Sequence, residues 1–181
     1  YRKYDKDSWT VTLNSGSTKF TINAVNEIVP GACRIIKASE DGVIAGVSFR
    51  ITGNVIDETA KTNENGELIF SSLKPGRYTV TEDTEDKYIP QESKAVTVVT
   101  GETAVVTFSN VLKKGSLKVV KTAEDGFKEN FTFRLTGTSY SGLPVNEYAV
   151  TNNNGEAVFE NVLIGTDYVL EEINTPARYV V

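Results

Sequence analysis

The chain carries the segment Gly31-Ala-Cys-Arg-Ile-Ile-Lys37 and repeats its pattern 84 residues later as Gly115-Ser-Leu-Lys-Val-Val-Lys121. Side chains alternate between the two faces of an extended strand, so the apolar residues of each copy mark a buried face that ends in a lysine. A buried ammonium is costly unless it is paired or neutral. One such lysine would be explained by a strand end at which the side chain reaches water. Two such lysines at matching positions require an explanation.

The composition indicates an all-β chain of one or two domains. Its 181 residues are 39 % apolar and 24 % charged, which suits soluble domains with a real core, and alternating patterns rich in Thr, Val and Tyr dominate. The net charge of −5 argues against nucleic-acid binding, and no apolar run is long enough to span a bilayer. Because the chain starts at Tyr1 and contains no Met, we expect it to be an internal segment of a longer protein.

Two residue counts limit the chemistry. The chain has no His and a single Cys, Cys33, which excludes an internal disulfide, a His-based triad, a Cys/His pair and a His/Cys zinc site. Cys33 lies on the apolar face of its segment, where a small buried hydrophobe is expected. No metal site is predicted, because Asn63-Glu-Asn-Gly-Glu67 fits a hairpin better than a calcium loop.

Further internal matches follow the two lysine segments. The matched pairs are Glu40 to Gly42 with Glu124 to Gly126, Val47 to Gly53 with Phe131 to Gly137, Thr62 to Gly66 with Thr151 to Gly155, and Tyr78 to Glu82 with Tyr168 to Glu172. They predict a complete module over 28–112, called the first module, and the N-terminal part of a second module over 113–181, whose last strands are missing or supplied by a neighbour. Residues 1–27, with strands predicted at 9–13 and 19–26, resemble the C-terminal strands of a module whose head is missing.

Strand parity places two more polar residues on each buried face. Glu82 shares a face with Tyr78 and Val80, and Glu172 occupies the same position in the second module. Asn110 shares a face with Val106 and Phe108, as Asn26 does with Ile22 and Ala24. Each module is therefore expected to direct a Lys, a Glu and an Asn at its interior. A buried ion pair beside an amide, or three strand ends that reach water, would be the structural explanation.

These motifs resemble the Cna B-type (prealbumin-like, SpaA-like) domains of Gram-positive surface adhesins and pilins. The likeness rests on Gly-x-Leu-x-Val-x-Lys at 115–121, the Thr-x-x-x-Gly hairpins, the Tyr-x-Val/Leu-x-Glu boxes that end at Glu82 and Glu172, and Phe-Ser-Asn at 108–110. It implies tandem Greek-key β-sandwiches. It also implies an autocatalytic isopeptide bond, with Lys37 as nucleophile, Asn110 as electrophile and Glu82 as proton shuttle. In the second module the resemblance implies that Lys121 is the nucleophile and Glu172 the proton shuttle.

The residue types suit this reaction. An apolar site favours the neutral, nucleophilic form of an amine and the neutral form of a carboxylic acid, which can then polarise the amide. Folding supplies the proximity, so no cofactor is predicted, and the chain is expected to be no enzyme beyond this single self-directed step.

The second module departs from the pattern because no asparagine at the matching position follows Glu172. Either its partner lies in a further module of a tandem array, or Asn26 of a neighbouring identical chain completes it by strand donation. The predicted partners are therefore adjacent modules or identical subunits.

Three functions follow from these patterns. The first is a structural stalk or fibre module, extracellular, in a cell wall or surface appendage. The second is an adhesin domain that binds a host matrix protein or glycan through loop residues such as Tyr140, Ser141 and Tyr148. The third, a glycosidase using Asp83, Glu85 and Asp86, is weak because such clusters are usually solvated turns.

Overall fold

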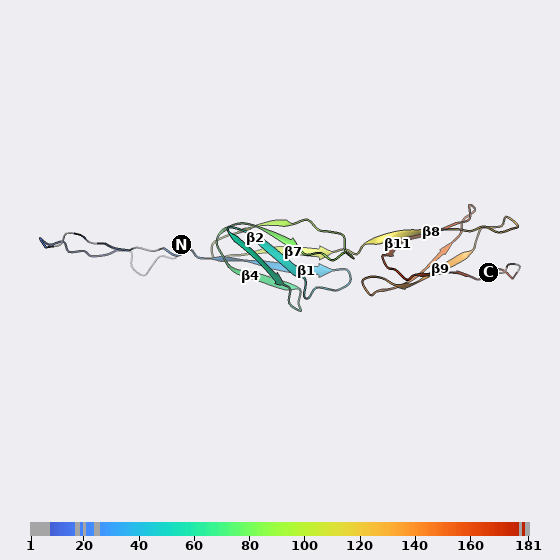
Figure 1. Ribbon diagram of the computed structural model, residues 1–181, viewed down its shortest axis with the longest axis horizontal. Helices are drawn as coiled ribbons and strands as arrows, with labels where there is room; N and C mark the ends of the chain where they lie inside the picture. Colours follow the sequence, from blue (N-terminus) through green and yellow to red (C-terminus); the bar gives the residue numbers. More distant parts are fainter. Residues whose placement is uncertain (1–7, 17–18, 20, 24–25, 178, 180–181) are drawn as a thin grey trace. The chain divides into compact units, whose positions relative to one another are not determined.

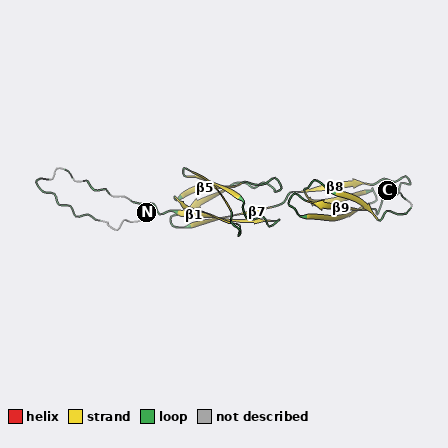
Figure 2. Cartoon of the chain, turned by 60° about the horizontal axis from the view of Figure 1, so that its bottom comes forward, coloured by secondary structure: helices red, strands yellow, loops and turns green. Residues whose placement is uncertain are grey.

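The computed structural model (Figure 1) describes residues 8–16, 19, 21–23, 26–177 and 179. Within these residues the chain forms twelve strands and no helix, which confirms the all-β prediction. The strands are yellow in Figure 2. None of the described segments is a helix with the length and apolar character needed to cross a membrane. The chain divides into two compact units: residues 1–38, 44–83 and 92–108, and residues 39–43, 84–91 and 109–181.

The first module is a two-layer sandwich. Its strands are β1 (Gly31–Ser39), β2 (Ser48–Gly53), β3 (Ile56–Lys61), β4 (Glu67–Leu73), β5 (Gly76–Glu82), β6 (Lys94–Val98) and β7 (Thr103–Asn110). One sheet has the order β4-β1-β7 and the other β3-β2-β5-β6. The Ala32 N–H donates to Glu102 O, and the Glu40 N–H donates to Asn110 O. Both bonds join residues 70 apart, so β1 and β7 run parallel in one register.

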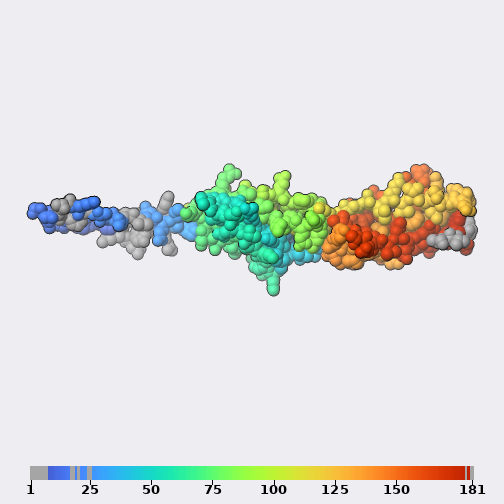
Figure 3. All heavy atoms as spheres, viewed as in Figure 1, coloured from blue at the N-terminus to red at the C-terminus, as the bar shows by residue number. Residues whose placement is uncertain are grey.

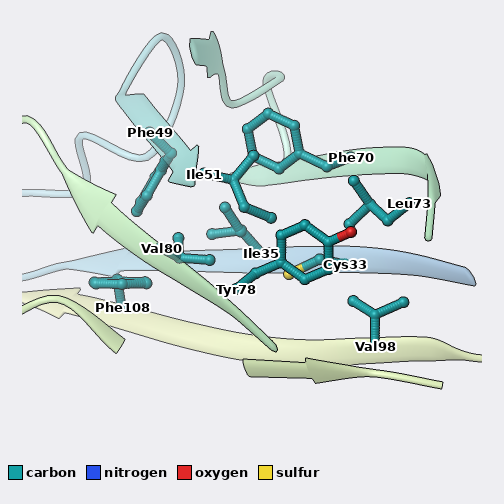
Figure 4. Close-up of a cluster of buried hydrophobic side chains, with 10 residues drawn as sticks. All are labelled: Cys33, Ile35, Phe49, Ile51, Phe70, Leu73, Tyr78, Val80, Val98 and Phe108. Atoms are coloured by element: carbon teal, nitrogen blue, oxygen red, sulfur yellow. The ribbon is translucent and has the colours of Figure 1, made fainter. Parts of the chain in front are cut away.

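The inward faces of the two sheets form an apolar core (Figure 4). Strand alternation predicted its members: in β1 the buried residues alternate with half-buried ones from Gly31 to Lys37. The rings of Phe49 and Phe108 lie 5.0 Å apart in a tilted arrangement. Cys33 is fully buried, which raises the pKa of its thiol and confirms that it acts as a small hydrophobe.

The second module repeats five of these strands. They are β8 (Lys114–Val120), β9 (Thr132–Thr138), β10 (Pro144–Val150), β11 (Glu156–Leu163) and β12 (Val169–Ile173). The sheets have the orders β11-β8 and β10-β9-β12. Glu82 pairs with Phe49 across β5 and β2, and Glu172 pairs with Phe133 across β12 and β9. In the described part of this module, nothing corresponds to β6 and β7.

The exposure of β8 follows from that difference. Every residue of β8 except the half-buried Val119 is exposed, and the strand lies at the surface of the second module in Figure 3, where it is yellow. The prediction that the apolar residues of both lysine segments are buried therefore holds for β1 and is wrong for β8. Leu117 is 37 % exposed, whereas its counterpart Cys33 is fully buried. Strand β1 has β7 beside it as well as β4, whereas among the described residues β8 pairs only with β11.

The strands predicted at 9–13 and 19–26 are wrong for the residues that the structure describes there, none of which lies in a strand. Trp9 and Val11 are about two-fifths exposed and Leu13 is 72 % exposed. A two-stranded ribbon with no apolar layer to pack against is marginal at best, which explains the difference. The parts of the prediction that fall on 17–18, 20 and 24–25 lie outside the described residues.

Candidate functional site

The first predicted pair meets inside the core of the first module. Lys37 Nζ lies 3.5 Å from Glu82 Oε2, and the two side chains are 0 % and 1 % exposed. The amine also donates to Ala38 O at 2.7 Å. Parity had assigned both residues to buried faces, and their burial confirms it. A charged ammonium at this depth is costly unless it is paired, and the carboxyl group of Glu82 is the group that lies beside it.

A hairpin turn holds the backbone of each lysine. The Lys37 N–H donates to Gly66 O at 2.8 Å, and the Lys121 N–H donates to Gly155 O at 2.7 Å. Both glycines have left-handed backbones, and a Cβ on Gly66 would lie 2.8 Å from Lys37 O. Only glycine fits this approach, so the repeated Thr-x-x-x-Gly hairpins fix the position of the lysines.

The predicted electrophile is also buried. Asn110 ends β7, the strand beside β1, and is 1 % exposed. Gln91 Nε2 donates to Ser109 O and to Asn110 Oδ1, both at 2.7 Å. A backbone carbonyl can only accept, so the Gln91 atom that faces it is the amide nitrogen. The Asn110 atom that faces the same nitrogen must then be oxygen, which sets the orientation of the Asn110 amide.

Sequence reasoning missed Gln91, which the structure brings into contact with the predicted electrophile Asn110. It lies in the irregular stretch between β5 and β6, where no strand period assigns a side chain to either face. No sequence pattern identifies Gln91 until the fold is known. A donor on the Asn110 oxygen withdraws charge from the carbonyl carbon and would stabilise an oxyanion formed there.

The second module brings together two of its three predicted parts. Lys121 Nζ lies 2.8 Å from Glu172 Oε2 and 4.7 Å from the centre of the Phe131 ring. Thr175 donates to Glu172 Oε1 at 3.0 Å. The Lys121 and Glu172 side chains are 19 % and 10 % exposed. Their charged atoms are therefore closer together, and more exposed to solvent, than those of Lys37 and Glu82 in the first module. Asn26 is exposed and lies outside any strand.

A carboxylate in the turn after each lysine segment binds a tyrosine. Tyr88 donates to Asp41 at 2.8 Å, and Tyr179 donates to Asp125 at 2.8 Å. Lys87 Nζ lies 3.3 Å from Asp41 Oδ2. Burial alone would raise the pKa of Asp41, but hydrogen bonds from Ser39, Tyr88 and the Val43 N–H, together with Lys87, lower it to about 2.

Replacing Asp41 by Asn is expected to weaken the fold at pH 7 and to flatten its response to acid. Because the folded-state pKa lies below the unfolded one, the stabilisation is complete above about pH 4 and is lost as the pH falls towards 2. The difference between the folded and unfolded pKa of Asp41 corresponds to about 2 kcal/mol in the free energy of unfolding. Thermal melts from pH 7 to pH 2 measure it. Asp57→Asn is the control: Asp57 lies in an exposed ion pair with Arg50, so this substitution should change the stability and its pH dependence little. Equal losses of stability in acid for the wild type and Asp41→Asn would contradict the expectation.

The residues of the other hypotheses lie apart from this chemistry. Tyr140 and Tyr148 are each 57 % exposed and Ser141 is half-buried, so the adhesin hypothesis stays a prediction. Asp83, Glu85 and Asp86 are exposed. Asn63 Oδ1 accepts from the backbone of its own hairpin at 2.9 and 3.0 Å. Among the described residues, no three His, Cys, Asp or Glu side chains gather as metal ligands would.

Comparison with known proteins gives the family. The model of the SpaA prealbumin-like fold domain matches residues 31–112 and again residues 115–181. Prealbumin-like domains of the pilin type are structural modules rather than enzymes.

Individual relatives are distant. The Bacillus anthracis TIE protein superimposes with a TM-score of 0.57 at 24 % identity, over 80 % of this chain and 31 % of that one. A streptococcal ancillary pilin gives a TM-score of 0.41 at 18 % identity, over 86 % and 57 %. The BOS complex subunit NOMO1 of Mus musculus is 26 % identical over 171 residues, which are 89 % of this chain and 12 % of that protein. Because the family model matches both modules, the chain belongs to the SpaA family of prealbumin-like fold domains.

Proposed function

We propose that the chain is a structural stalk or fibre segment of a bacterial surface protein or pilus, located outside the cell and hardened by Lys–Asn isopeptide bonds. The family supports the structural role. The observation that carries the bond is the fully buried Lys37–Glu82 pair. Lys37 lies in β1, which runs parallel to β7, the strand that ends in the buried Asn110. An unreacted amine at this depth is costly, and amide formation removes the cost.

The reaction balances without a cofactor. The lone pair of neutral Lys37 Nζ attacks Asn110 Cγ, and a C–N bond forms. The tetrahedral adduct then expels Nδ2, which leaves as ammonia after taking a proton from the attacking nitrogen. Glu82, beside the amine, relays that proton: its neutral carboxyl group gives a proton to the leaving nitrogen and takes one from the attacking nitrogen, which leaves the acid unchanged. Gln91, which donates to Asn110 Oδ1, stabilises the oxyanion.

The product would change how the module bears load. The bond would join β1, near the start of the first module, to the end of β7. A pulling force applied at the two ends would pass through this covalent link and bypass the strands between them. This property suits a stalk.

Intact-mass spectrometry tests the proposal. The purified chain should weigh less than its sequence by one ammonia molecule for each bond formed, and a peptide carrying Lys37 joined to Asn110 should appear after digestion. A full sequence mass in a folded sample would contradict the proposal.

Replacing Gln91 by Ala is expected to slow bond formation in the first module by on the order of 10²-fold, the cost of losing one oxyanion donor. The time course of ammonia loss after refolding measures the rate. Gln91→Glu is the informative companion, since a carboxylate cannot donate to the Asn110 oxygen and should be at least as slow. Wild-type rates in both variants would remove Gln91 from the reaction.

The second module has the amine and the acid, but no asparagine of 113–181 occupies the position that matches Asn110, so we propose a partner from outside this segment. A later segment of a longer tandem array is one source. Asn26 of a neighbouring copy is the other, and it would polymerise the chain head to tail. Boiling in denaturant before electrophoresis separates the two, because only covalent polymerisation gives a ladder of multimers.

A further inference from the structure

A turn of sequence Ser39-Glu-Asp-Gly42 follows directly after the segment that carries Lys37. Its glycine supplies the left-handed backbone that the turn needs, with a φ of 76°. The hydrogen bonds of Glu40 serve no such local purpose, because they reach residues 70 and 72 positions further along the chain. The Glu-Asp pair, which recurs at 124–125, therefore acts at a distance from its own turn.

Glu40 holds the end of the strand that carries Asn110. Its backbone N–H donates to Asn110 O at 3.0 Å, and its side-chain Oε2 accepts from the Leu112 N–H at 2.8 Å. A carboxylate is a strong acceptor for such a bond, and Leu112 is only 4 % exposed, so water competes little for it. A single residue thus binds the backbone on both sides of Val111.

The other edge of the same segment is bound by the residues that precede Gln91. The Ile89 N–H donates to Val111 O at 2.9 Å, and the Lys113 N–H donates to Lys87 O at the same distance. The stretch that begins with the predicted electrophile is therefore hydrogen-bonded along both edges, which fixes its backbone while leaving its side chain able to react.

Asp41, the next residue of the turn, holds the segment that carries Gln91. Tyr88 donates to Asp41 Oδ2 at 2.8 Å, and Lys87 Nζ lies 3.3 Å from the same oxygen. The Asp41 side chain is 1 % exposed, and Tyr88 is also buried. Two consecutive carboxylates therefore hold the two segments that bring Gln91 and Asn110 together.

We propose that Glu40 and Asp41 are positioning residues for the isopeptide reaction. Glu40 sets the position of the electrophile Asn110, and Asp41 sets the position of the oxyanion donor Gln91. Both carboxylates lie in the turn directly after the strand of the nucleophile, so one short turn places both groups relative to the amine. This inference rests on the isopeptide chemistry proposed above.

Glu40→Ala is expected to slow the loss of ammonia after refolding by roughly 10- to 100-fold, because a misplacement of about 1 Å at the reacting atoms has an effect of this size. Glu40→Gln should restore the wild-type rate, since its side-chain oxygen still accepts from the Leu112 N–H. Both variants lose the ion pair with Lys114, so restoration assigns the effect to the hydrogen bond. Glu124→Ala, the matched change in the second module, should leave the rate unaltered. All rates are compared below each variant's melting temperature, where the folded fractions are equal.

Tyr88→Phe tests the role of Asp41 separately. The change removes the hydroxyl that binds Asp41 and keeps the buried ring. It should slow ammonia loss in the wild-type background and cause no further slowing in Gln91→Ala, because Asp41 acts through Gln91. Glu40→Ala acts on Asn110 and should slow the reaction in both backgrounds. Equal slowing by Tyr88→Phe in both backgrounds would overturn the role of Asp41.

The outcomes separate the positioning role from the reaction itself. A wild type that keeps its full mass would overturn the bond and the positioning role together. A wild type that loses ammonia while Glu40→Ala loses it equally fast would overturn the role of Glu40 and leave the bond in place. Glu40→Gln as slow as Glu40→Ala would overturn the assignment to the Leu112 hydrogen bond.

Discussion

Lys37→Ala is expected to retain the full sequence mass of the first module, where the proposed bond would cost the wild type one ammonia, and to lower the melting temperature by roughly 15–30 °C. Cross-linking residues 37 and 110 closes a loop of 73 residues, which contributes on the order of 4 kcal/mol by restricting the unfolded chain. A domain of this size shifts by roughly 4–8 °C for each kcal/mol. Intact mass and thermal unfolding, measured on the same samples, give both quantities.

The controls separate the bond from the packing around it. Asn110→Ala leaves the lysine in place but removes its target, so it should lose the same bond and a comparable amount of stability. The double variant should then lose little more than either single one, because the shared interaction is already gone. Lys121→Ala, the same substitution in the second module, should leave the first bond intact. Additive losses in the double variant would show that the two residues stabilise the module independently.

Glu82→Gln is expected to stop bond formation on a preparative timescale while the module still folds. Glutamine keeps the size of the side chain and can hydrogen-bond, but it cannot carry a proton, and a general acid–base group contributes about 10²–10⁴-fold. Freshly folded variant should therefore retain its full mass when the wild type has lost ammonia. The rate of mass change after refolding from denaturant measures the effect.

The second module supplies the matched control for this residue. Glu172 occupies the same register opposite Phe133 that Glu82 occupies opposite Phe49, so Glu172→Gln removes an equivalent acid elsewhere. It should leave the first bond unaffected. Normal ammonia loss in Glu82→Gln would show that Glu82 only fills the space beside Lys37 and moves no proton.

Much of the first site could be read from strand parity alone. Lys37, Glu82 and Asn110 each continue an alternating apolar face, and all three are buried in the structure. Alternation succeeds here because side chains two apart on a strand must share a face, and each of these strands has a complete sandwich around it.

The same rule was wrong for β8 and for residues 9–13. Leu117 and Leu13 alternate correctly, yet they are 37 % and 72 % exposed. Parity assigns residues to faces but cannot say whether a face is covered, because burial depends on a second layer that lies elsewhere in the chain or in another molecule.

The sequence by itself determined the strand pattern, the module repeat and the identity of the amine, acid and carboxamide, because all of these follow from local periodicity. Only the tertiary structure decided that Lys37 lies beside Glu82, that Gln91 orients the Asn110 amide, and that the Glu40 N–H donates to Asn110 O. These facts depend on contacts between residues distant in the chain or in irregular segments, which the folded sheets bring together and no local pattern encodes.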